Sequence, residues 1–313
     1  MIYGARICLC SFCGTLVVME ERIVVSFILA ILGLVAGSFA GASVWRLRNR
    51  ELRLDEANGE KIAASDKRQV AKLQRKPLSS DRSVCLHCGH ELAWYDLIPL
   101  VSWASLRGNC RYCYTFIGWF EPAIEISVAV FFVLSYLVWP SSFLSFADTA
   151  QFVIWLIAGI ALAILFVYDA KWYLLPNIIT FPLIGLGAVN ALIVAVHSGF
   201  APSVVANIVF ACVVLSGFYY VIYVLSQKQW VGFGDVKLGL GLALLLADWQ
   251  LAIMALFLGN LIGTLVFLPS MLRGKVKSQT HIPLGPLLIL GWAISGLFGA
   301  DILHWYTAFT LGV

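Results

Sequence analysis

The sequence predicts an all-α membrane protein with about eight transmembrane helices and a small cytoplasmic domain between the first and second. Of its 313 residues, 61% are hydrophobic and only 12% are charged, about half of the roughly 25% that soluble proteins carry. Several apolar runs reach the ~20 residues that a helix needs to cross a bilayer. These runs do not alternate with polar residues, which excludes a β-barrel, so helices must satisfy the backbone within the lipid.

Eight apolar segments are expected to form the spans. The first precedes a long polar stretch, and the other seven follow it. The sixth is too short to cross alone, so it is tilted, broken at Gly239 and Gly241, or shielded by protein. The aromatic tail after Asp301 is expected at the membrane interface. The predicted spans are Ile23–Val44, Ala123–Trp139, Phe152–Tyr168, Ile178–Val196, Val204–Leu225, Val236–Ala247, Leu251–Leu272 and Pro283–Ala300.

These segments divide the chain into four parts. Residues 1–22 form an N-terminal stub, which is either a functional extension or the product of a start codon placed upstream of Met19. Residues 23–45 are the first transmembrane helix, and residues 46–119 are the polar domain. Residues 120–313 form the membrane domain that would carry catalysis. Within the polar domain, Arg50–Arg82 is charged and poor in aromatic residues, as in a solvated helix or a linker. A basic face that contacts anionic lipid headgroups is the alternative.

The distribution of basic residues sets the orientation. Thirteen of the 21 Lys and Arg residues lie between Arg46 and Arg111, whereas the connections 140–151, 197–203 and 248–250 have none. Basic connections face the cytoplasm, so the polar domain is expected there. The net charge of +4 therefore reflects orientation against the lipid and does not indicate nucleic-acid binding.

Two C-x-x-C pairs in the polar domain predict a metal site. Cys85 and Cys88 form the first pair, and Cys110 and Cys113 form the second after 21 intervening residues. Four thiolates complete the closed tetrahedral shell of structural zinc, with no position left open for catalysis. Two disulfides or a redox pair are the alternatives, and a cytoplasmic location argues against stable disulfides.

Two acidic residues stand at the ends of apolar segments. Asp169 follows the run that begins near Phe152, and Asp235 stands in the sequence Gly232-Phe233-Gly234-Asp235 before another run. A carboxylate beside hydrocarbon loses solvation, so it is a functional candidate by default. Since both acids fall on the predicted cytoplasmic side, we expect them to share one site.

The residues around the two acids favour a built site. Gly232 and Gly234 have no Cβ to obstruct substrate or backbone near Asp235. Pro176 and Asn177 break the chain after Asp169, which leaves a non-helical stretch that must border protein or water. Lys237 could tune the acids, but its position favours a role in which the ammonium group extends to lipid phosphates.

Paired carboxylates can hydrolyse a peptide bond. One proton is shared between them, so one member acts as a base toward water while the other polarises the scissile carbonyl. A proton-coupled membrane transporter that uses Asp169 and Asp235 as a relay is the alternative, although the acids lie at one face and no inverted repeat is present. A metal-bearing assembly scaffold without catalysis is a third hypothesis.

From about Gly37 to Trp292 the chain resembles the prepilin leader peptidase family, which groups with the GxGD-type intramembrane aspartyl proteases. The matching segments are Arg82-Ser83-x-Cys85-x-x-Cys88, Trp94-Tyr95-Asp96-x-Ile98-Pro99-Leu100, Leu106-Arg107-Gly108-x-Cys110-Arg111-x-Cys113, Asp169 with Leu175-Pro176-Asn177, Gly232-x-Gly234-Asp235-x-Lys237-Leu238, and Ile282-Pro283-x-Gly285-Pro286.

The resemblance implies an aspartic endopeptidase with Asp169 and Asp235 as its catalytic pair. Its substrates would be type IV prepilins or the pseudopilins of type II secretion, cut after a short basic leader at the cytoplasmic face of the bacterial inner membrane. The resemblance also implies methylation of the new N-terminus with S-adenosylmethionine, for which the sequence assigns no binding residues. Glu121 and Glu125 either contact that cofactor or stabilise a helix start, and their position favours the second role.

Overall fold

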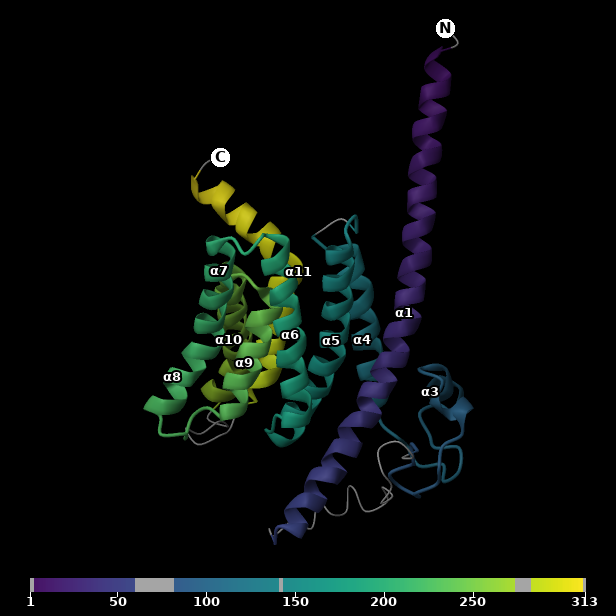
Figure 1. Ribbon diagram of the computed structural model, residues 1–313. Helices are drawn as coiled ribbons and strands as arrows, with labels where there is room; N and C mark the ends of the chain where they lie inside the picture. The colour runs from purple at the N-terminus through teal and green to yellow at the C-terminus, as the bar shows by residue number, and fades with distance from the viewer. Residues whose placement is uncertain (1–2, 60–81, 141–142, 274–282, 312–313) are drawn as a thin grey trace. The chain divides into compact units, whose positions relative to one another are not determined.

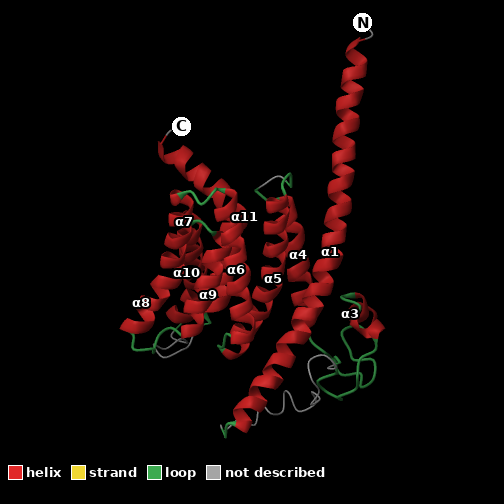
Figure 2. Ribbon diagram, viewed as in Figure 1, coloured by secondary structure: helices red, strands yellow, loops and turns green. Residues whose placement is uncertain are grey.

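The computed structural model describes residues 3–59, 82–140, 143–273 and 283–311, with the backbone alone for residues 3–19 and Met271. Within these ranges the secondary structure is helical, with isolated β-bridges and no β-strand (Figure 2). The all-α prediction is therefore confirmed. The chain divides into two compact units, Met1–Leu137 (unit 1) and Val138–Val313 (unit 2).

Unit 1 consists of two long helices and the cysteine-bearing domain between them. Helix α1 (Tyr3–Ala57) extends the predicted first span by more than three turns into the polar segment. Helix α4 (Phe120–Leu137) corresponds to the second span. The domain between them holds the 3₁₀ turn η1 (Trp94–Leu97) and the short helix α3 (Val101–Ser105). The predicted linker Arg50–Arg82 is helical up to Ala57, and residues 60–81 lie outside the described residues.

Glycines on α1 bring its backbone against α4. A Cβ added to Gly33 would lie 2.5 Å from Ala129 Cα, and one added to Gly37 would lie 2.6 Å from Glu125 Cα. Such contacts are possible only without a side chain, which is how small residues support helix packing in membranes. These two glycines therefore fix where the helices touch.

Unit 2 is a bundle of antiparallel helices (Figure 1). Because consecutive helices reverse direction, the ends of α5, α8 and α10 and the starts of α6, α9 and α11 lie together at one end of the unit, called here the acid end. The helices are α5 (Phe146–Trp172), α6 (Asn177–His197), α7 (Pro202–Cys212), α8 (Phe218–Leu225), α9 (Phe233–Leu246), α10 (Trp249–Leu272) and α11 (Leu284–Leu311).

A π-helical turn interrupts the predicted fifth span. This turn, η2 (Val213–Gly217), joins α7 to α8 and faces α9. A Cβ on Gly239 of α9 would lie only 2.8 Å from the Leu215 carbonyl oxygen, and the Ser216 hydroxyl donates to the Val236 carbonyl over 2.9 Å. The π turn and α9 are thus in close backbone contact, and such turns are frequent near functional sites.

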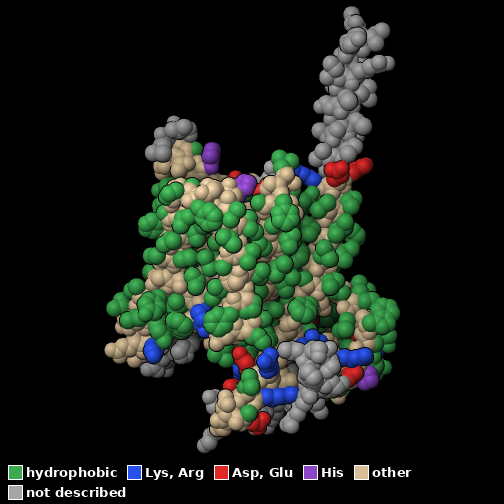
Figure 3. All heavy atoms as spheres, in the orientation of Figure 1, with side chains coloured by type: hydrophobic (Ala, Val, Ile, Leu, Met, Phe, Trp, Pro, Cys, Tyr) green, Lys and Arg blue, Asp and Glu red, His purple; other side chains and the backbone are tan. Residues whose placement is uncertain are grey.

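Among the described residues, seven helices are long and apolar enough to cross a membrane, as a multi-pass protein requires. The predicted sixth span is α9, which has 14 residues and continues unbroken through Gly239 and Gly241. Half of its residues are buried, so shielding by neighbouring helices is what accommodates its short length. Hydrophobic side chains cover much of the outer surface of the other unit 2 helices, as expected where lipid surrounds them (Figure 3). The tail after Asp301 continues α11 to Leu311.

The contact between α10 and α11 gives a direct test of this packing. A Cβ on Gly291 would lie 2.3 Å from the Ala255 carbonyl oxygen and 2.7 Å from the Gly259 nitrogen, both backbone atoms. Gly291→Ala should therefore destabilise the protein by about 1–3 kcal/mol through overpacking. The midpoint of thermal unfolding in detergent measures the change.

Gly185→Ala is the matched control, because a Cβ at Gly185 of α6 would meet nothing within 4 Å. This substitution should leave the midpoint unchanged or raise it, since alanine favours a helix over glycine by roughly 1 kcal/mol. Equal midpoints for the two variants would contradict the close α10–α11 contact.

Candidate active site and metal centre

Asp169 lies buried in the last turn of α5. Its side chain faces the start of α11, where the Gly285 backbone N–H donates to its Oδ2 over 3.0 Å. A Cβ on Gly285 would lie 2.8 Å from the same oxygen, so only glycine leaves room for the carboxylate. The first N–H groups of a helix have no partner within the helix and attract negative charge. Asp169 therefore occupies an anion position at the N-terminus of α11.

Asp235 occupies the matching position in the first turn of α9. The carboxylate reaches back to accept the N–H of Gly232 over 3.2 Å, and its own N–H donates to the Gly232 carbonyl over 3.1 Å. The side chain is half-buried and lies within the electrostatic field of Asp169. Each acid is therefore held by a backbone N–H at a helix start, although one acid ends its helix and the other begins its own.

Two contacts join the α5–α6 connection to the start of α9. Gly234 packs against Leu175, where a Cβ would come within 3.1 Å of the leucine side chain. Lys237 donates from its Nζ to Asn177 Oδ1 and lies 5.4 Å from the ring centres of both Phe181 and Phe233. The ammonium group of Lys237, expected to extend to lipid phosphates, is therefore hydrogen-bonded to protein in the structure.

The structure places the other predicted residues of this site at the same end. Pro176 precedes α6 as its N-cap, and Asn177 is the first residue of that helix, so the non-helical stretch is limited to 173–176. Tyr173 ends α5 in the left-handed region at φ 57°. Gly232 is the N-cap of α9, and Gly234 lies in its first turn directly before Asp235.

Three further residues that are connected to the acids were not predicted from the sequence as parts of the site. Gly285 was noted only in a motif, although it bonds directly to Asp169. Tyr219 on α8 is 5% exposed, interacts with the charge of Asp235 and forms a hydrogen bond with Asn260 of α10. The available signal was a hydroxyl and an amide inside otherwise apolar runs, where polar side chains require partners.

This arrangement can perform acid–base chemistry. Two carboxylates that interact strongly titrate as a pair and can share one proton. The pair can then remove a proton from water and donate one to a carbonyl or amine. Asp169, Asp235 and the loops beside them are the candidate active site.

The four predicted cysteines come together in unit 1. Their sulfur atoms all lie within 4.8 Å of one another, and Cys85 Sγ is 3.9 Å from Cys113 Sγ. A tetrahedral thiolate centre with metal–sulfur bonds of about 2.3 Å would place its sulfurs about 3.8 Å apart. All four are free thiols, so neither of the two disulfides forms. The cluster could therefore hold one metal ion.

The two cysteine pairs have the same backbone geometry. In the first, the Cys85 N–H donates to the His90 carbonyl and the Gly89 N–H donates to the Cys85 carbonyl. In the second, Cys110 makes the equivalent bonds with Thr115 and Tyr114. Gly89 has a positive φ of 75°, which glycine adopts readily, whereas Tyr114 adopts φ 58° at the matching position, which the sequence did not indicate.

The pKa values of the cysteine thiols bear on how a bound cation would change their ionisation. Burial raises the pKa of Cys85 to about 12, whereas hydrogen bonds from Thr115 lower the pKa of Cys113 to about 6. Without a cation, Cys85 would therefore remain a neutral thiol near pH 7. A bound metal ion would stabilise the thiolate and release its proton.

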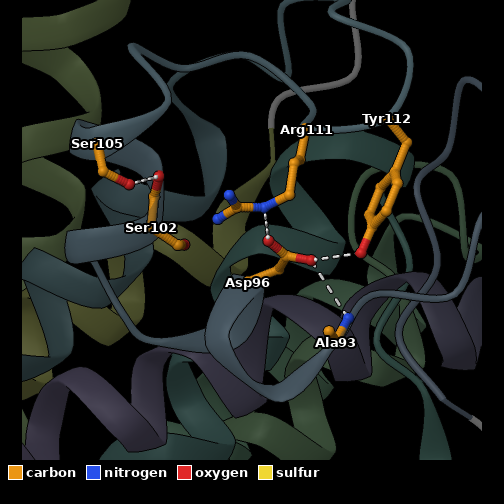
Figure 4. A network of polar contacts seen from close by, with 6 residues as sticks. All are labelled: Ala93, Asp96, Ser102, Ser105, Arg111 and Tyr112. Carbon is orange, nitrogen blue, oxygen red and sulfur yellow. Dashed lines mark hydrogen bonds and ion pairs between the residues drawn. The ribbon is translucent and has the colours of Figure 1, made fainter.

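An ion-pair network fastens η1 to the second cysteine pair (Figure 4). The Arg111 Nε donates to Asp96 Oδ1 over 2.7 Å, and the Tyr112 hydroxyl and Ala93 N–H donate to Oδ2 over 3.0 and 3.3 Å. Burial opposes the ionisation of Asp96, but the bonds from Arg111 and Tyr112 outweigh it and hold the pKa of Asp96 below its ordinary value.

Comparison with known proteins identifies relatives that match most of the chain. Residues 31–139 match the bacterial peptidase A24 N-terminal domain, and residues 156–268 match the type IV leader peptidase family. Proteins named prepilin leader peptidase/N-methyltransferase are similar along most of their length. The one from Pseudomonas aeruginosa is 30% identical over 89% of this chain and 92% of its own.

Two further relatives with the same name come from Aeromonas salmonicida and Burkholderia pseudomallei. The first is 30% identical over 87% of this chain and 90% of its own length. The second is 31% identical over 86% of this chain and 84% of its own length. No solved structure matches the chain.

The metal centre leads to a measurable expectation. Purified protein should contain about one metal ion per chain, because four thiolates complete one tetrahedral shell. Cys85→Ser combined with Cys110→Ser should abolish binding, since it removes one ligand from each pair. Multi-element mass spectrometry of the protein measures the content. Cys212→Ser, on α7 and outside the cluster, should keep the metal, and retention by the double variant would contradict the assignment.

Proposed function

The chain belongs to the type IV leader peptidase family, and on this premise we propose that it is an intramembrane aspartyl endopeptidase that removes the short basic leader from type IV prepilins or pseudopilins. Asp169 and Asp235 are its catalytic pair. The observation that carries the proposal is the position of the two interacting carboxylates at adjoining helix ends of one compact unit.

The two carboxylates act as one unit in the proposed reaction. With one proton between them, the ionised acid removes a proton from a water molecule, and the protonated acid donates to the scissile carbonyl oxygen. The resulting tetrahedral diol collapses as a proton passes to the leaving amine. The N–H groups of Gly285 and Gly232 keep the two side chains in place, and no covalent intermediate is needed.

We place the acid end of unit 2 at the cytoplasmic face of the bacterial inner membrane. Three lysines belong to this end: Lys171 at the end of α5, Lys228 before α9, and Lys237 on α9. The connections at the other end of the unit contain no Lys or Arg. This asymmetry supports the orientation, because basic connections remain in the cytoplasm. Prepilin leaders would therefore be cut before export.

Two cofactors complete the proposal. We assign structural zinc to the four cysteines, because zinc prefers a closed tetrahedral thiolate shell. We also propose that the protein methylates the new N-terminus with S-adenosylmethionine, as the names of its relatives support. The methyl donor supplies an electrophilic methyl group to the freed amine, while unit 2 performs the hydrolysis.

Removing either catalytic charge tests the peptidase. Asp169→Asn and Asp235→Asn should each lower the rate of leader removal by about 10²–10⁴-fold, since a positioned acid or base contributes that much. Membranes containing each variant are incubated with a prepilin, and product masses report cleavage and any added methyl group. Asp301→Asn, an exposed position on α11, should cleave normally. Normal cleavage by either active-site variant refutes the assignment.

Gly285 offers a test of positioning. In Gly285→Ala the new methyl group would lie 2.8 Å from Asp169 Oδ2 and displace the carboxylate. A displacement of about 1 Å can cost roughly 10²-fold in rate, so kcat should fall by about 10–10²-fold while KM changes little. Initial rates over a range of prepilin concentrations separate the two constants.

Gly296→Ala distinguishes this effect from general damage to α11. Its new methyl group would lie 2.3 Å from the ring of Trp155 on α5, far along the helix from Asp169. We expect a lower unfolding temperature with kcat of the folded enzyme close to that of the parent. A similar loss of kcat in both variants would show that packing of α5 on α11, and not the place of Asp169, controls the rate.

A further inference from the structure

The cysteine domain carries exposed hydrophobic side chains that neither the peptidase nor the metal centre uses. Val101 is 61% exposed, Phe116 is 50% exposed and Trp119 is 67% exposed. These three residues are called here the outer edge of the domain. They do not line the cavity that α1, α4 and the cysteine domain enclose, which Trp103 and Leu106 line. Exposed apolar side chains that gather on one side of a domain mark a surface that meets a protein or a membrane.

Local packing gathers the outer edge around α3. The ring centres of Trp103 and Trp119 lie 4.4 Å apart. Phe116 joins them at Gly108, where an added Cβ would meet the rings of both Phe116 and Trp103 within 3.1 Å. Val101 is the first residue of α3, the helix that also carries Trp103. The three side chains therefore belong to one packed arrangement.

One hydrogen bond sets the level of the outer edge along a membrane-spanning helix. The N–H of Leu100, directly before Val101, donates to Glu125 Oε2 over 2.9 Å. Glu125 lies about 7.5 Å along α4 from Phe120, because it is five residues later and the helix rises about 1.5 Å per residue. Trp119 stands directly before the same helix. The outer edge is therefore level with the first two turns of α4.

The length of α4 places these two turns in the bilayer. The helix has 18 residues and is about 27 Å long, whereas the hydrocarbon core of a bilayer is about 30 Å thick. Every turn of α4 is therefore needed for the crossing. Figure 1 shows α3 on the side of the cysteine domain that faces along α1 toward the predicted span. Hydrophobic side chains cover this side, and charged and histidine side chains lie on the side away from the span (Figure 3).

The exposed apolar surface continues from the outer edge onto α4. Trp119 is followed at helical spacing by Ala123, Ile126 and Val130, all of them exposed. Residues at this spacing share one face of a helix, and on a membrane span an exposed apolar face meets lipid. Because the chain passes from the outer edge to this face without a break, lipid is the occupant that the observations favour over a protein partner.

We propose that the outer edge of the cysteine domain is inserted into the leaflet in which α4 begins, where its side chains contact lipid acyl chains. Tryptophan is typical of this level, because its amphipathic ring suits the boundary between headgroups and hydrocarbon. Apolar faces that lie in this boundary are buried by about 5–10 Å, which matches the level set by the Leu100 bond. Arg107, exposed after α3, can extend its guanidinium group to lipid phosphates.

A photoreactive residue in the full chain tests the proposal. The photoreactive amino acid p-benzoylphenylalanine is incorporated in place of Phe116 or of Trp119, and membranes that contain the protein are irradiated. Mass spectrometry of the peptide that carries the probe should show the added mass of one phospholipid, with the new bond on an acyl chain. The same adduct is expected with the probe at Phe27, an exposed position in the span of α1.

Leu54 is the matched control outside the bilayer. It is a hydrophobic residue of α1 that is 54% exposed, close to the value for Phe116. It lies ten residues beyond Val44, the predicted end of the span, which is about 15 Å further along the helix. The probe at Leu54 should therefore form no lipid adduct.

The adducts distinguish the possible occupants of the outer edge. An acyl-chain adduct at either edge position, with none at Leu54, supports insertion. Adducts confined to headgroups, adducts with a prepilin or a second copy of the chain, or no adduct at either edge position overturn it. Equal lipid adducts at Leu54 also overturn it, because the edge would then lie no deeper than the end of α1. Gel-filtration profiles and unfolding temperatures identify any variant that has not folded. The proposal requires only the membrane spans, so it stands or falls independently of the peptidase.

Discussion

The hydrogen bond from the Gly285 N–H to Asp169 is the contact on which the candidate active site depends. A carboxylate in an apolar unit needs compensation, and here the compensation comes from the backbone at the start of α11. Asp235 is held in the same way by Gly232 at the start of α9. Because the donor in each bond is a backbone N–H, the position of each carboxylate follows from the position of a helix end. The bundle therefore sets the geometry of the acids.

Glycine contacts set the positions of those helix ends. Gly239 brings α9 against the π turn, Gly291 brings α11 against α10, and Gly296 admits the ring of Trp155, which stacks on Trp292 at 3.9 Å. Each contact tolerates little displacement, since interiors packed this closely resist small changes of volume. The bond between Lys237 and Asn177 adds a polar link at the mouth of the site. Short helices can hold reactive groups accurately when their neighbours leave no free space.

The sequence predicted the helical class, the four cysteines and the approximate spans, because composition, C-x-x-C spacing and apolar length are local properties. It left the short sixth span undecided, since only the neighbours of α9 show that it is shielded. Gly285 and Tyr219 were missed as site residues for the same reason. Gly285 bonds to Asp169, which is 116 positions away in the sequence, and Tyr219 bonds to Asn260 on another helix. The left-handed backbone of Tyr114 could not be predicted from its residue type, because glycine adopts this conformation more readily. The hydrogen bonds of the second cysteine pair impose it.

The two units compensate their buried carboxylates with different hydrogen-bond donors. In unit 2 both acids accept backbone N–H groups at helix starts, where the helix dipole favours negative charge. Glu125 in unit 1 lies in the second turn of its own helix and accepts from Leu100, a residue at φ 56° in the cysteine domain. That bond ties the cysteine domain to α4 through a residue whose φ lies in the left-handed region. Cys85 and Cys110 line the same cavity as Glu125, so a metal ion held by the cysteines would stabilise the domain that supplies this bond. Unit 1 therefore compensates its buried acid with a donor from the cysteine domain, whereas unit 2 uses the starts of its own helices.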